Sequence, residues 1–474
     1  MVAMTLTTVL APCLLKTPQA SPTNMSVVTL QLGQCGNQIG GEFYNTLLQD
    51  LHIRNPHVSP RANENYIQEA IDRFFVECKT KSGLAGLLEA RAVMVDMEPK
   101  VIVQTCQLAR RSGLWRYPVN QQLCHQRGSG NNWANGFLSC GPKAKETVMN
   151  MIRKEAEKCD CLGGFLCLMS VAGGTGSGVG AYLTRCLRDV YPNAFILNQV
   201  IWPYHTGEVI VQNYNALLTL SNLYQTSDGI LLINNDQLQD ICTRRLHIKQ
   251  VTFENMNCVV ADQLTSLLQP VYKANTGKTV HNCLGDMLQT LTPHPEYKLL
   301  MVKKTPQVSE KVAAYNSDTW TGLLKHLRQM QLADSATDEG INWSLSVNDD
   351  VPRGAAVKYN RSLSSLLMLR GEQLATADTA LFQDQRLYTP WTLPELSFTK
   401  WYQPRSFQHY DKSATLVSNS QMTAKPLDHV VSRAWDMFSA KAFFHQYCDY
   451  GLTASDFLDS FACLEQIIAN YASL

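Results

Sequence analysis

Short apolar runs alternate with turns and amphipathic segments through the first half of the chain. The run at 27–32 is followed by a glycine-containing turn at 33–36, and apolar residues then recur at 39, 43 and 47, which is the spacing of one helix face. Later apolar runs, each ending in a polar or glycine-rich turn, lie at 92–95, 165–171, 195–201 and 229–233. This alternation predicts βαβ units on a parallel sheet, whose strand ends meet at one ligand crevice.

The hydrophobic pattern changes near residue 252. Residues 253–268 predict one long, largely apolar helix, and a mixed region of short strands follows, with a proline-rich patch at 388–394. We interpret this region as a second domain. Apolar positions between 430 and 442, and again between 457 and 471, recur at helical spacing, and Thr453 with Asp456 predicts a capping box at the start of the last helix.

Composition and charge exclude several classes of protein. The chain has 474 residues, of which 45% are hydrophobic and 17% charged, so it can bury a large core. Its 41 basic and 40 acidic residues leave a net charge of +1, which provides no global field for nucleic acid or an acidic membrane. Without such a field, we expect no nucleic-acid partner. No run of about 18 apolar residues occurs, so we also expect no membrane insertion.

The cysteines and the N-terminal segment argue against secretion. The 15 cysteines are scattered, and the one close pair, Cys159 and Cys161, fits neither a zinc site nor a disulfide framework. We expect free thiols in a reducing cytosol. Residues 1–24 contain no basic n-region and no convincing cleavage site, so they are predicted to form a flexible leader ahead of a second plausible start at Met25.

A glycine-rich stretch at 172–178 is the strongest chemical signal. Four of its seven residues are glycine, and it lies between a predicted buried strand and a helix that begins near Gly180. Such a loop lets backbone N–H groups converge on an anion, and the helix N-terminus adds its partial positive charge. The stretch therefore predicts a phosphate site, with a loop that serves only packing as the alternative.

Two other phosphate-binding patterns fit less well. The tripeptide Gly-Lys-Thr at 277–279 is not a Walker-type loop, because Tyr272 occupies the position of the required earlier glycine. A dinucleotide fingerprint can be placed on the glycine-rich stretch, but no acidic residue for the ribose lies between 196 and 205. A soluble nucleotide-dependent enzyme of the dinucleotide-binding type is therefore the alternative of another class.

Two further groups of polar residues lie close to predicted strands. Residues 126–133 form a second glycine- and amide-rich cluster that can donate hydrogen bonds to phosphate oxygens. Asp96 and Glu98 follow the run at 92–95 and could hold a water-shelled Mg²⁺, which binds through few protein carboxylates plus phosphates. Taken alone, the cluster would more often be a turn and the two acids a solvated surface.

Four loop motifs together resemble the nucleotide loops of the tubulin family. They lie at 33–38, 95–99, 128–133 and 173–178, in the order and with the spacing of that family, and the resemblance runs from Met25 to Leu474. It implies an α/β tubulin fold with a Rossmann-like parallel sheet. The predicted segments are the leader at 1–24, a GTP-binding domain at 25–251, a central helix at 252–272, an α/β intermediate domain at 273–423 and a C-terminal helical domain at 424–474.

The resemblance also implies which residues bind GTP or GDP. Gln34, Cys35 and Gln38 would line the phosphates and the base. Phe253 would stack on guanine and Asn257 would bond its edge, because amide contacts left unsatisfied by another base specify guanine. The remaining implied residues are Glu98, Gly128, Ser129, Gly130, Asn131, Ser170, Gly173, Gly174, Thr175, Gly176, Glu208 and Asn235. Mg²⁺ would be held through water by Glu98 and Asp96.

Two departures from the α and β subunits fall at this site. Gln212 stands where those subunits usually carry a ribose-binding acid, and we expect Glu208 to compensate. Lys100 follows Pro99 where those subunits carry a small residue. Our hypothesis is that the charge of Lys100 partly replaces that of magnesium.

Asp286 is the candidate catalytic residue. By resemblance it occupies the position of the α-subunit glutamate that activates water on the next subunit's GTP, where the β subunit has lysine. A carboxylate there could orient or deprotonate water once a second subunit supplies the nucleotide. The alternative is that Asp286 only favours the start of a helix through its charge. His281 and Cys283 replace the family's flanking polar pair, so the contact between subunits is expected to differ.

The C-terminal sequence points to a specialised tubulin. The α and β subunits end in a glutamate-rich tail, whereas residues 451–474 contain only Asp456, Asp459 and Glu465 as acids. Segments at 96–102, 201–204, 207–215, 323–330 and 416–421 resemble the delta subfamily, which is associated with centrioles, basal bodies and triplet microtubules. This implies a cytoskeletal role at the centrosome and cilium, with epsilon-like or α/β tubulins and centriolar proteins as partners. A gamma-like nucleating cap is the alternative within the family.

Overall fold

The computed structural model describes residues 25–53, 55–78, 87–126, 128–309, 312, 318–347 and 359–474. The leader predicted at 1–24 lies outside the described residues, and so does Arg127 of the second glycine cluster.

One long sheet runs through the described part of the molecule, with its strands in the order β10-β13-β12-β14-β11-β9-β8-β7-β1-β4-β6. The parallel half comprises β1 (Ser26–Leu32), β4 (Ala92–Asp96), β6 (Gln122–Cys124), β7 (Leu162–Ser170), β8 (Ile196–Trp202) and β9 (Gly229–Asn234). The mixed half comprises β10 (Tyr272–Lys273), β11 (Leu299–Thr305), β12 (Ser362–Gly371), β13 (Phe398–Gln403) and β14 (Lys412–Ser420). A small separate sheet contains β2 (Phe75–Glu77), β3 (Leu88–Ala90) and β5 (Trp115–Arg116).

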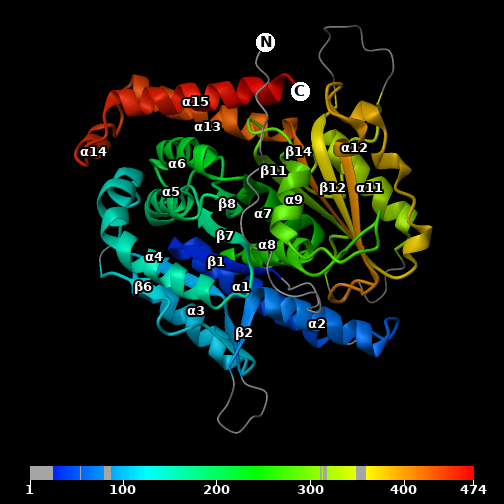
Figure 1. The fold of residues 1–474 in the computed structure, drawn as a ribbon. Helices are drawn as coiled ribbons and strands as arrows, with labels where there is room; N and C mark the ends of the chain where they lie inside the picture. The colour runs from blue at the N-terminus through cyan, green and yellow to red at the C-terminus, as the bar shows by residue number, and fades with distance from the viewer. Residues whose placement is uncertain are drawn as a thin grey trace, which may run out of the picture.

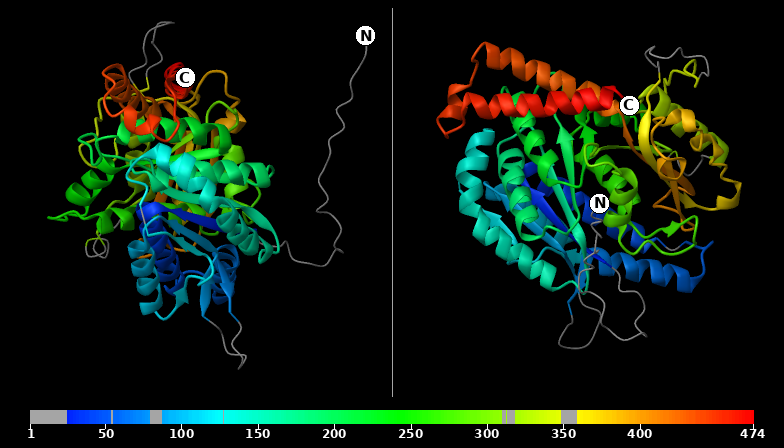
Figure 2. Two further views of the ribbon diagram at one scale, coloured as in Figure 1. Left: turned by 90° about the vertical axis from the view of Figure 1, so that its left-hand side faces the viewer. Right: turned by 45° about the horizontal axis from the view of Figure 1, so that its top comes forward.

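Helices cover both faces of the parallel half (Figure 1). One face carries α1 (Gly33–His52), α3 (Pro99–Arg111) and α8 (Phe253–Leu268), and the other carries α4 (Gly141–Glu157), α5 (Gly180–Val190) and α6 (Gln212–Thr226). Because both faces are covered, β1, β4, β8 and β9 are buried along their whole length. Figure 2 shows α13 (Ala424–Ser439) and α15 (Ala454–Ala472) lying across the helices of the second face, where both pack on α6.

The remaining helical elements are shorter or lie toward the edges of the fold. The α-helices among them are α2 (Pro60–Phe74), α7 (Asn235–Asp240), α9 (Cys283–Leu291), α11 (Trp320–Ala333), α12 (Pro394–Ser397) and α14 (His445–Cys448). The π-helical turns are η1 (Asn135–Cys140), η2 (Thr175–Val179) and η3 (Ile241–Arg245). The 3₁₀ turns are η4 (Leu374–Thr376), η5 (Ala380–Phe382), η6 (Gln385–Leu387) and η7 (Gln421–Thr423).

The hydrophobic pattern predicted the parallel half and its class correctly, with local exceptions. The predicted capping box of Thr453 and Asp456 is present, and the helix predicted at 253–268 has those ends. Residues 33–36, predicted as a turn, instead form the first turn of α1, because Gly33 at φ +71° lets the helix begin directly after the strand. The helical repeat predicted to 442 ends at Ser439.

The region interpreted as a second domain is joined to the first by backbone hydrogen bonds. Its first long strand, β11, pairs in parallel with β9, so the sheet continues without a break from the nucleotide-side strands into the mixed half. The division at residues 273 and 423 remains a prediction about domains. None of the fourteen cysteines of the described residues forms a disulfide bond. No helix in the described ranges is long and apolar enough to span a membrane.

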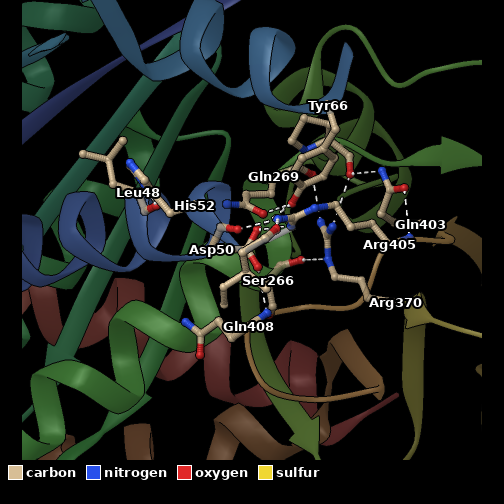
Figure 3. Close-up of polar contacts among 12 residues, drawn as sticks. Leu48, Asp50, His52, Tyr66, Ser266, Gln269, Arg370, Gln403, Arg405 and Gln408 are labelled. Carbon is tan, nitrogen blue, oxygen red and sulfur yellow. Dashed lines mark hydrogen bonds and ion pairs between the residues drawn. The ribbon is translucent and has the colours of Figure 1, made fainter. Parts of the chain in front are cut away.

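A buried polar network ties α1 to the mixed half of the sheet (Figure 3). The carboxylate of Asp50, near the end of α1, is fully buried and lies 2.7 Å from Nη1 of Arg405. Its oxygens also accept hydrogen bonds from the Tyr66 hydroxyl at 3.1 Å and from the Gln408 amide at 2.7 Å. Arg370 on β12 donates to the last carbonyls of α8 and the turn beyond it, those of Ser266, Gln269 and Pro270.

Candidate functional site

A cavity of about 480 Å³ opens where the parallel strands end. Its wall includes Leu32 and Ser170, the last residues of β1 and β7, and Ile201, the next to last residue of β8, as the rule for open α/β sheets requires. The cavity is lined by every residue predicted for GTP or Mg²⁺: Gln34, Cys35, Gln38, Asp96, Glu98, Gly128, Ser129, Gly130, Asn131, Ser170, Gly173, Gly174, Thr175, Gly176, Glu208, Asn235, Phe253 and Asn257. The structure therefore brings these residues together around one space.

The first wall is the N-terminal end of α1, which sits close against β7. A Cβ atom on Gly36 would lie 2.0 Å from the carbonyl oxygen of Leu168, so only glycine permits this approach. Gln34, Cys35 and Gln38 line the cavity from this end of the helix. Burial raises the pKa of the Cys35 thiol to about 12, with a further contribution from the Glu208 carboxylate, so Cys35 remains a neutral thiol.

The second wall is made by two glycine loops that contact each other. The hydroxyls of Ser129 and Thr175 lie 2.9 Å apart, and Asn135 Nδ2 donates to the Ser129 carbonyl at 3.0 Å. Gly130 and Asn131 adopt left-handed backbone conformations, at φ +65° and +53°. This turn places residues 128–131 opposite the loop at 173–176, so the two loops border the same space as a phosphate cradle would require.

Asn215 on α6 holds both loops in place, although it lies outside the four nucleotide-loop motifs of the sequence. Its side chain is fully buried and donates to the carbonyls of Asn131 at 2.8 Å and Ala172 at 2.7 Å. Its oxygen accepts from the Trp133 amide at 2.9 Å and from the Tyr447 hydroxyl at 2.7 Å. An asparagine amid the apolar positions of a buried helix was the one available signal.

The acidic wall carries Asp96 and Glu98. Asp96 accepts a hydrogen bond from the Met97 amide at 2.7 Å, and burial raises the pKa of its carboxyl group to about 6. A Cβ on Gly128 would lie 2.5 Å from Oε1 of Glu98, so the glycine leaves room for this carboxylate. Among the described residues no three His, Cys, Asp or Glu side chains form a metal cluster. Two carboxylates suit a Mg²⁺ ion that takes its other ligands from phosphates and water.

The far end of the cavity is bounded by the start of α8. Thr252 and Asn255 form a capping box there, which fixes the first turn with Phe253, and Asn257 follows at the start of the second turn. Phe253 is 53% exposed although it is a large apolar residue, and it lines the cavity. Asn235, directly after β9, lines the same cavity. An exposed ring with amides beside it suits a planar heterocycle.

The loop at 203–211 explains the substitution at Gln212. The Gln212 side chain is buried, accepts from the amides of Glu208 and Val209, and donates to the Tyr204 carbonyl at 2.9 Å. It supports the loop and does not line the cavity, whereas Glu208 does, accepting a hydrogen bond from Asn235 Nδ2 at 3.0 Å. Burial raises the pKa of Glu208. This arrangement supports the prediction that Glu208 takes the place of the missing acid.

Lys100 and Asp286 lie apart from the lining of the cavity. Lys100 is exposed, so its proposed effect on magnesium remains a hypothesis. Asp286 lies in the first turn of α9, where Asn282 provides the cap, and its carboxylate is 2.9 Å from Nζ of Lys273. Because Asp286 does not line the cavity, it cannot act on a nucleotide bound there by the same chain. Its role toward the nucleotide of another subunit remains a prediction.

The cavity is formed by the parallel sheet, the two glycine loops and the start of α8. This combination defines a GTP-binding protein of the tubulin type. Residues 26–243 match the GTPase domain of the tubulin/FtsZ family. The chain belongs to the tubulin family. It is similar to the tubulin delta chains of mouse (49% identity over 458 residues), dog (48% over 458) and human (48% over 464), each match covering 95% of this chain and 100% of the relative. The alternative of a dinucleotide-binding enzyme receives no support.

Gly173 provides a test of the phosphate cradle that leaves the fold intact. A Cβ at this position would meet nothing closer than Asn131 Oδ1 at 3.7 Å, whereas one on Gly174 would lie 2.5 Å from Ser129 Oγ. Gly173→Ala is therefore expected to change the unfolding free energy by less than about 0.5 kcal/mol. Because the added methyl group points into space lined by both loops, we expect GTP affinity to fall about tenfold or more. Isothermal titration measures the GTP affinity, and denaturant unfolding measures the stability. An unchanged GTP affinity would contradict the placement of the phosphates.

Proposed function

We propose that this chain is a GTP-binding, delta-like tubulin that acts in the assembly or stability of centrioles and basal bodies, including triplet microtubules, and in microtubule organisation at cilia. The observation that carries the proposal is similarity to delta chains along 95% of the sequence and the whole of each relative. Its expected partners are other tubulins, epsilon-like or α/β, together with centriolar proteins at the centrosome.

In this proposal the cavity holds GTP or GDP with its phosphates between the two glycine loops. Gly174, Thr175 and Gly176 face the phosphates from one side and Gly128 to Asn131 from the other. Mg²⁺ would supply charge neutralisation at the phosphates, with Asp96 and Glu98 binding its waters. Glu208 would accept from the ribose hydroxyls, and Phe253 with Asn257 and Asn235 would bind guanine.

Replacing Asn257 tests the identity of the base. Asn257→Leu keeps the volume of the side chain but removes both its donor and its acceptor, so guanine loses an amide partner that adenine could not have used in the same way. We expect the ratio of GTP to ATP affinity to fall by about tenfold, measured by competition with a fluorescent nucleotide. The nucleotide released from gently purified protein provides the companion result. Bound NAD, or an unchanged ratio, would contradict the proposed guanine site.

Hydrolysis would be completed at a contact between subunits. Asp286 could orient water only if it leaves Lys273, because an ion-paired carboxylate is a weaker acceptor for a water proton. We expect single-turnover GTP hydrolysis with an α/β partner to slow by about 100-fold in Asp286→Ala and to rise in Lys273→Met. The exposed residue Lys249, replaced with methionine, is the control for the lost charge. Equal rates for the wild type and Asp286→Ala would remove the catalytic role.

The centriolar role is tested by partners and location in ciliated cells. A tagged chain should concentrate at centrioles or basal bodies, and pulldown should recover an epsilon-like tubulin. A gamma-like nucleating cap would instead recover nucleation-complex proteins, and this outcome would replace the proposed role. Diffuse distribution with neither set of partners would contradict both.

A further inference from the structure

The charges of this nearly neutral chain are distributed unevenly. Residues 99–145 contain no aspartate or glutamate, although the whole chain has almost as many acidic as basic residues. The same segment contains seven lysines and arginines: Lys100, Arg110, Arg111, Arg116, Arg127, Lys143 and Lys145. A local excess of one sign creates a field that the net charge of +1 conceals.

The fold gathers this segment at one edge of the long sheet. β6 is the outermost strand, α3 packs on one face beside it, and α4 packs on the other (Figure 1). The left panel of Figure 2 views this side of the molecule. We call the exposed residues of α3, of the connection at 112–126 and of the first turn of α4 the β6-edge surface. Two helices and a loop thus surround a single edge of the sheet.

Most of these charges have no acidic partner among the described residues. Arg110, Arg111 and Lys145 are exposed and lie within ion-pair distance of no described carboxylate. Arg116 is the exception, since it pairs with Glu89 at 2.6 Å. The neighbouring acid on α4 is Glu146. Farther along the chain, the acids Glu146, Glu155 and Glu157 equal in number the basic residues Arg153, Lys154 and Lys158, so the excess of positive charge is confined to residues 99–145.

Apolar side chains are interspersed with the charges. Val103, Leu108, Leu114 and Val119 are 51%, 44%, 43% and 66% exposed. The aromatic residues of the same segment, Trp115 and Tyr117, are 1% and 2% exposed and provide no platform for stacking bases. Guanidinium groups beside exposed aliphatic groups match a peptide that carries carboxylates and apolar residues. This composition favours a protein partner over single-stranded nucleic acid.

We propose that the β6-edge surface binds a glutamate-rich segment of a partner protein. The guanidinium groups of Arg110 and Arg111 bind its carboxylates in the paired geometry that lysine cannot offer. The aliphatic residues of α3 contact the apolar parts of the same segment. The α3 helix, at 13 residues, is about 20 Å long, which corresponds to roughly six residues of an extended peptide. This surface lies outside the nucleotide cavity, so the inference does not depend on the proposed function.

The test uses the full chain and a dye-labelled peptide of about eight glutamates, long enough to follow α3. The variant Arg110→Gln/Arg111→Gln is expected to bind the peptide about tenfold more weakly than the wild type, by fluorescence anisotropy at low salt. The matched control Lys249→Gln/Arg433→Gln removes two exposed charges elsewhere and is expected to bind within about twofold of the wild type. A glutamine peptide of the same length should not bind.

Three results would overturn the inference. The first is equal weakening in both double variants, which would show that only net charge matters. The second is tighter binding of a single-stranded oligonucleotide of equal charge, which would make the surface a nucleic-acid site. The third is preferential binding to vesicles rich in phosphatidylserine. Loss of GTP binding by the chain would change none of these comparisons, so failure of the proposed function is distinguishable from failure here.

Discussion

Replacing Arg405 with methionine is expected to lower the unfolding free energy by about 3–5 kcal/mol. The change leaves the Asp50 carboxylate fully buried without the guanidinium that lies 2.7 Å from it. It also removes the stacking of the guanidinium over the Tyr66 ring, at 4.6 Å from its centroid. Tyr66 and Gln408 still donate to the carboxylate, but neither neutralises its charge. Urea unfolding with GTP and magnesium held constant measures the loss.

Two companion variants show whether charge is the cause. Arg153→Met breaks an exposed ion pair within α4, with Glu157, and is expected to cost less than about 0.5 kcal/mol. Asp50→Asn combined with Arg405→Met removes both buried charges, so it should be more stable than Arg405→Met alone. If Arg405→Met were as mild as Arg153→Met, the network of Figure 3 would not be what holds α1 to the mixed half of the sheet.

The second large effect is expected for Asn215→Leu. Leucine has a similar volume but leaves the carbonyls of Asn131 and Ala172 and the amide of Trp133 without their partner. Each unsatisfied buried group costs about 1–3 kcal/mol, so the unfolding free energy should fall by about 3 kcal/mol or more. Because two of these groups belong to the glycine loops, GTP affinity should fall about tenfold or more, as a smaller rise in Tm on addition of GTP.

A matched substitution exists on the same helix. Asn222 on α6 donates only to the Leu218 carbonyl of its own helix, at 2.9 Å. Asn222→Leu is therefore expected to leave GTP affinity unchanged and to cost less than about 1 kcal/mol of stability. Equal GTP affinity in Asn215→Leu and Asn222→Leu would show that the glycine loops hold their positions without Asn215.

Much of the parallel half could be predicted because its information is local. Apolar runs such as 229–233 become strands buried on both faces, and the helix at 253–268 has an apolar pattern bounded by a cap and a proline. The turn expected at 33–36 was wrong because the same glycine that suits a turn also lets a helix begin directly after β1. Local preference cannot distinguish the two cases.

In the candidate site, too, the features that depend on local sequence were predictable and those that depend on distant contacts were not. Its glycine loops and the residues of α1 and α8 were predictable, since each motif is a short stretch with its own chemistry. The sequence did not assign Gln212 or Asn215 their positions, because these side chains act through hydrogen bonds to loops made elsewhere in the chain. Nor could it predict that Asp286 pairs with Lys273, since the pairing depends on how the segment between β10 and α9 folds back.

The amino-acid sequence by itself determined the class of fold, the motifs that line the cavity and the uneven distribution of charge between 99 and 145. These follow from periodicity, glycine content and residue counts, which need no knowledge of distant neighbours. Only the tertiary structure decided that the mixed strands extend the parallel sheet, that Asp50 and Arg405 meet across the core, and that the basic segment surrounds one sheet edge. The reason is physical: such pairings join residues far apart in the chain, and their energy is gained only when the whole fold has formed.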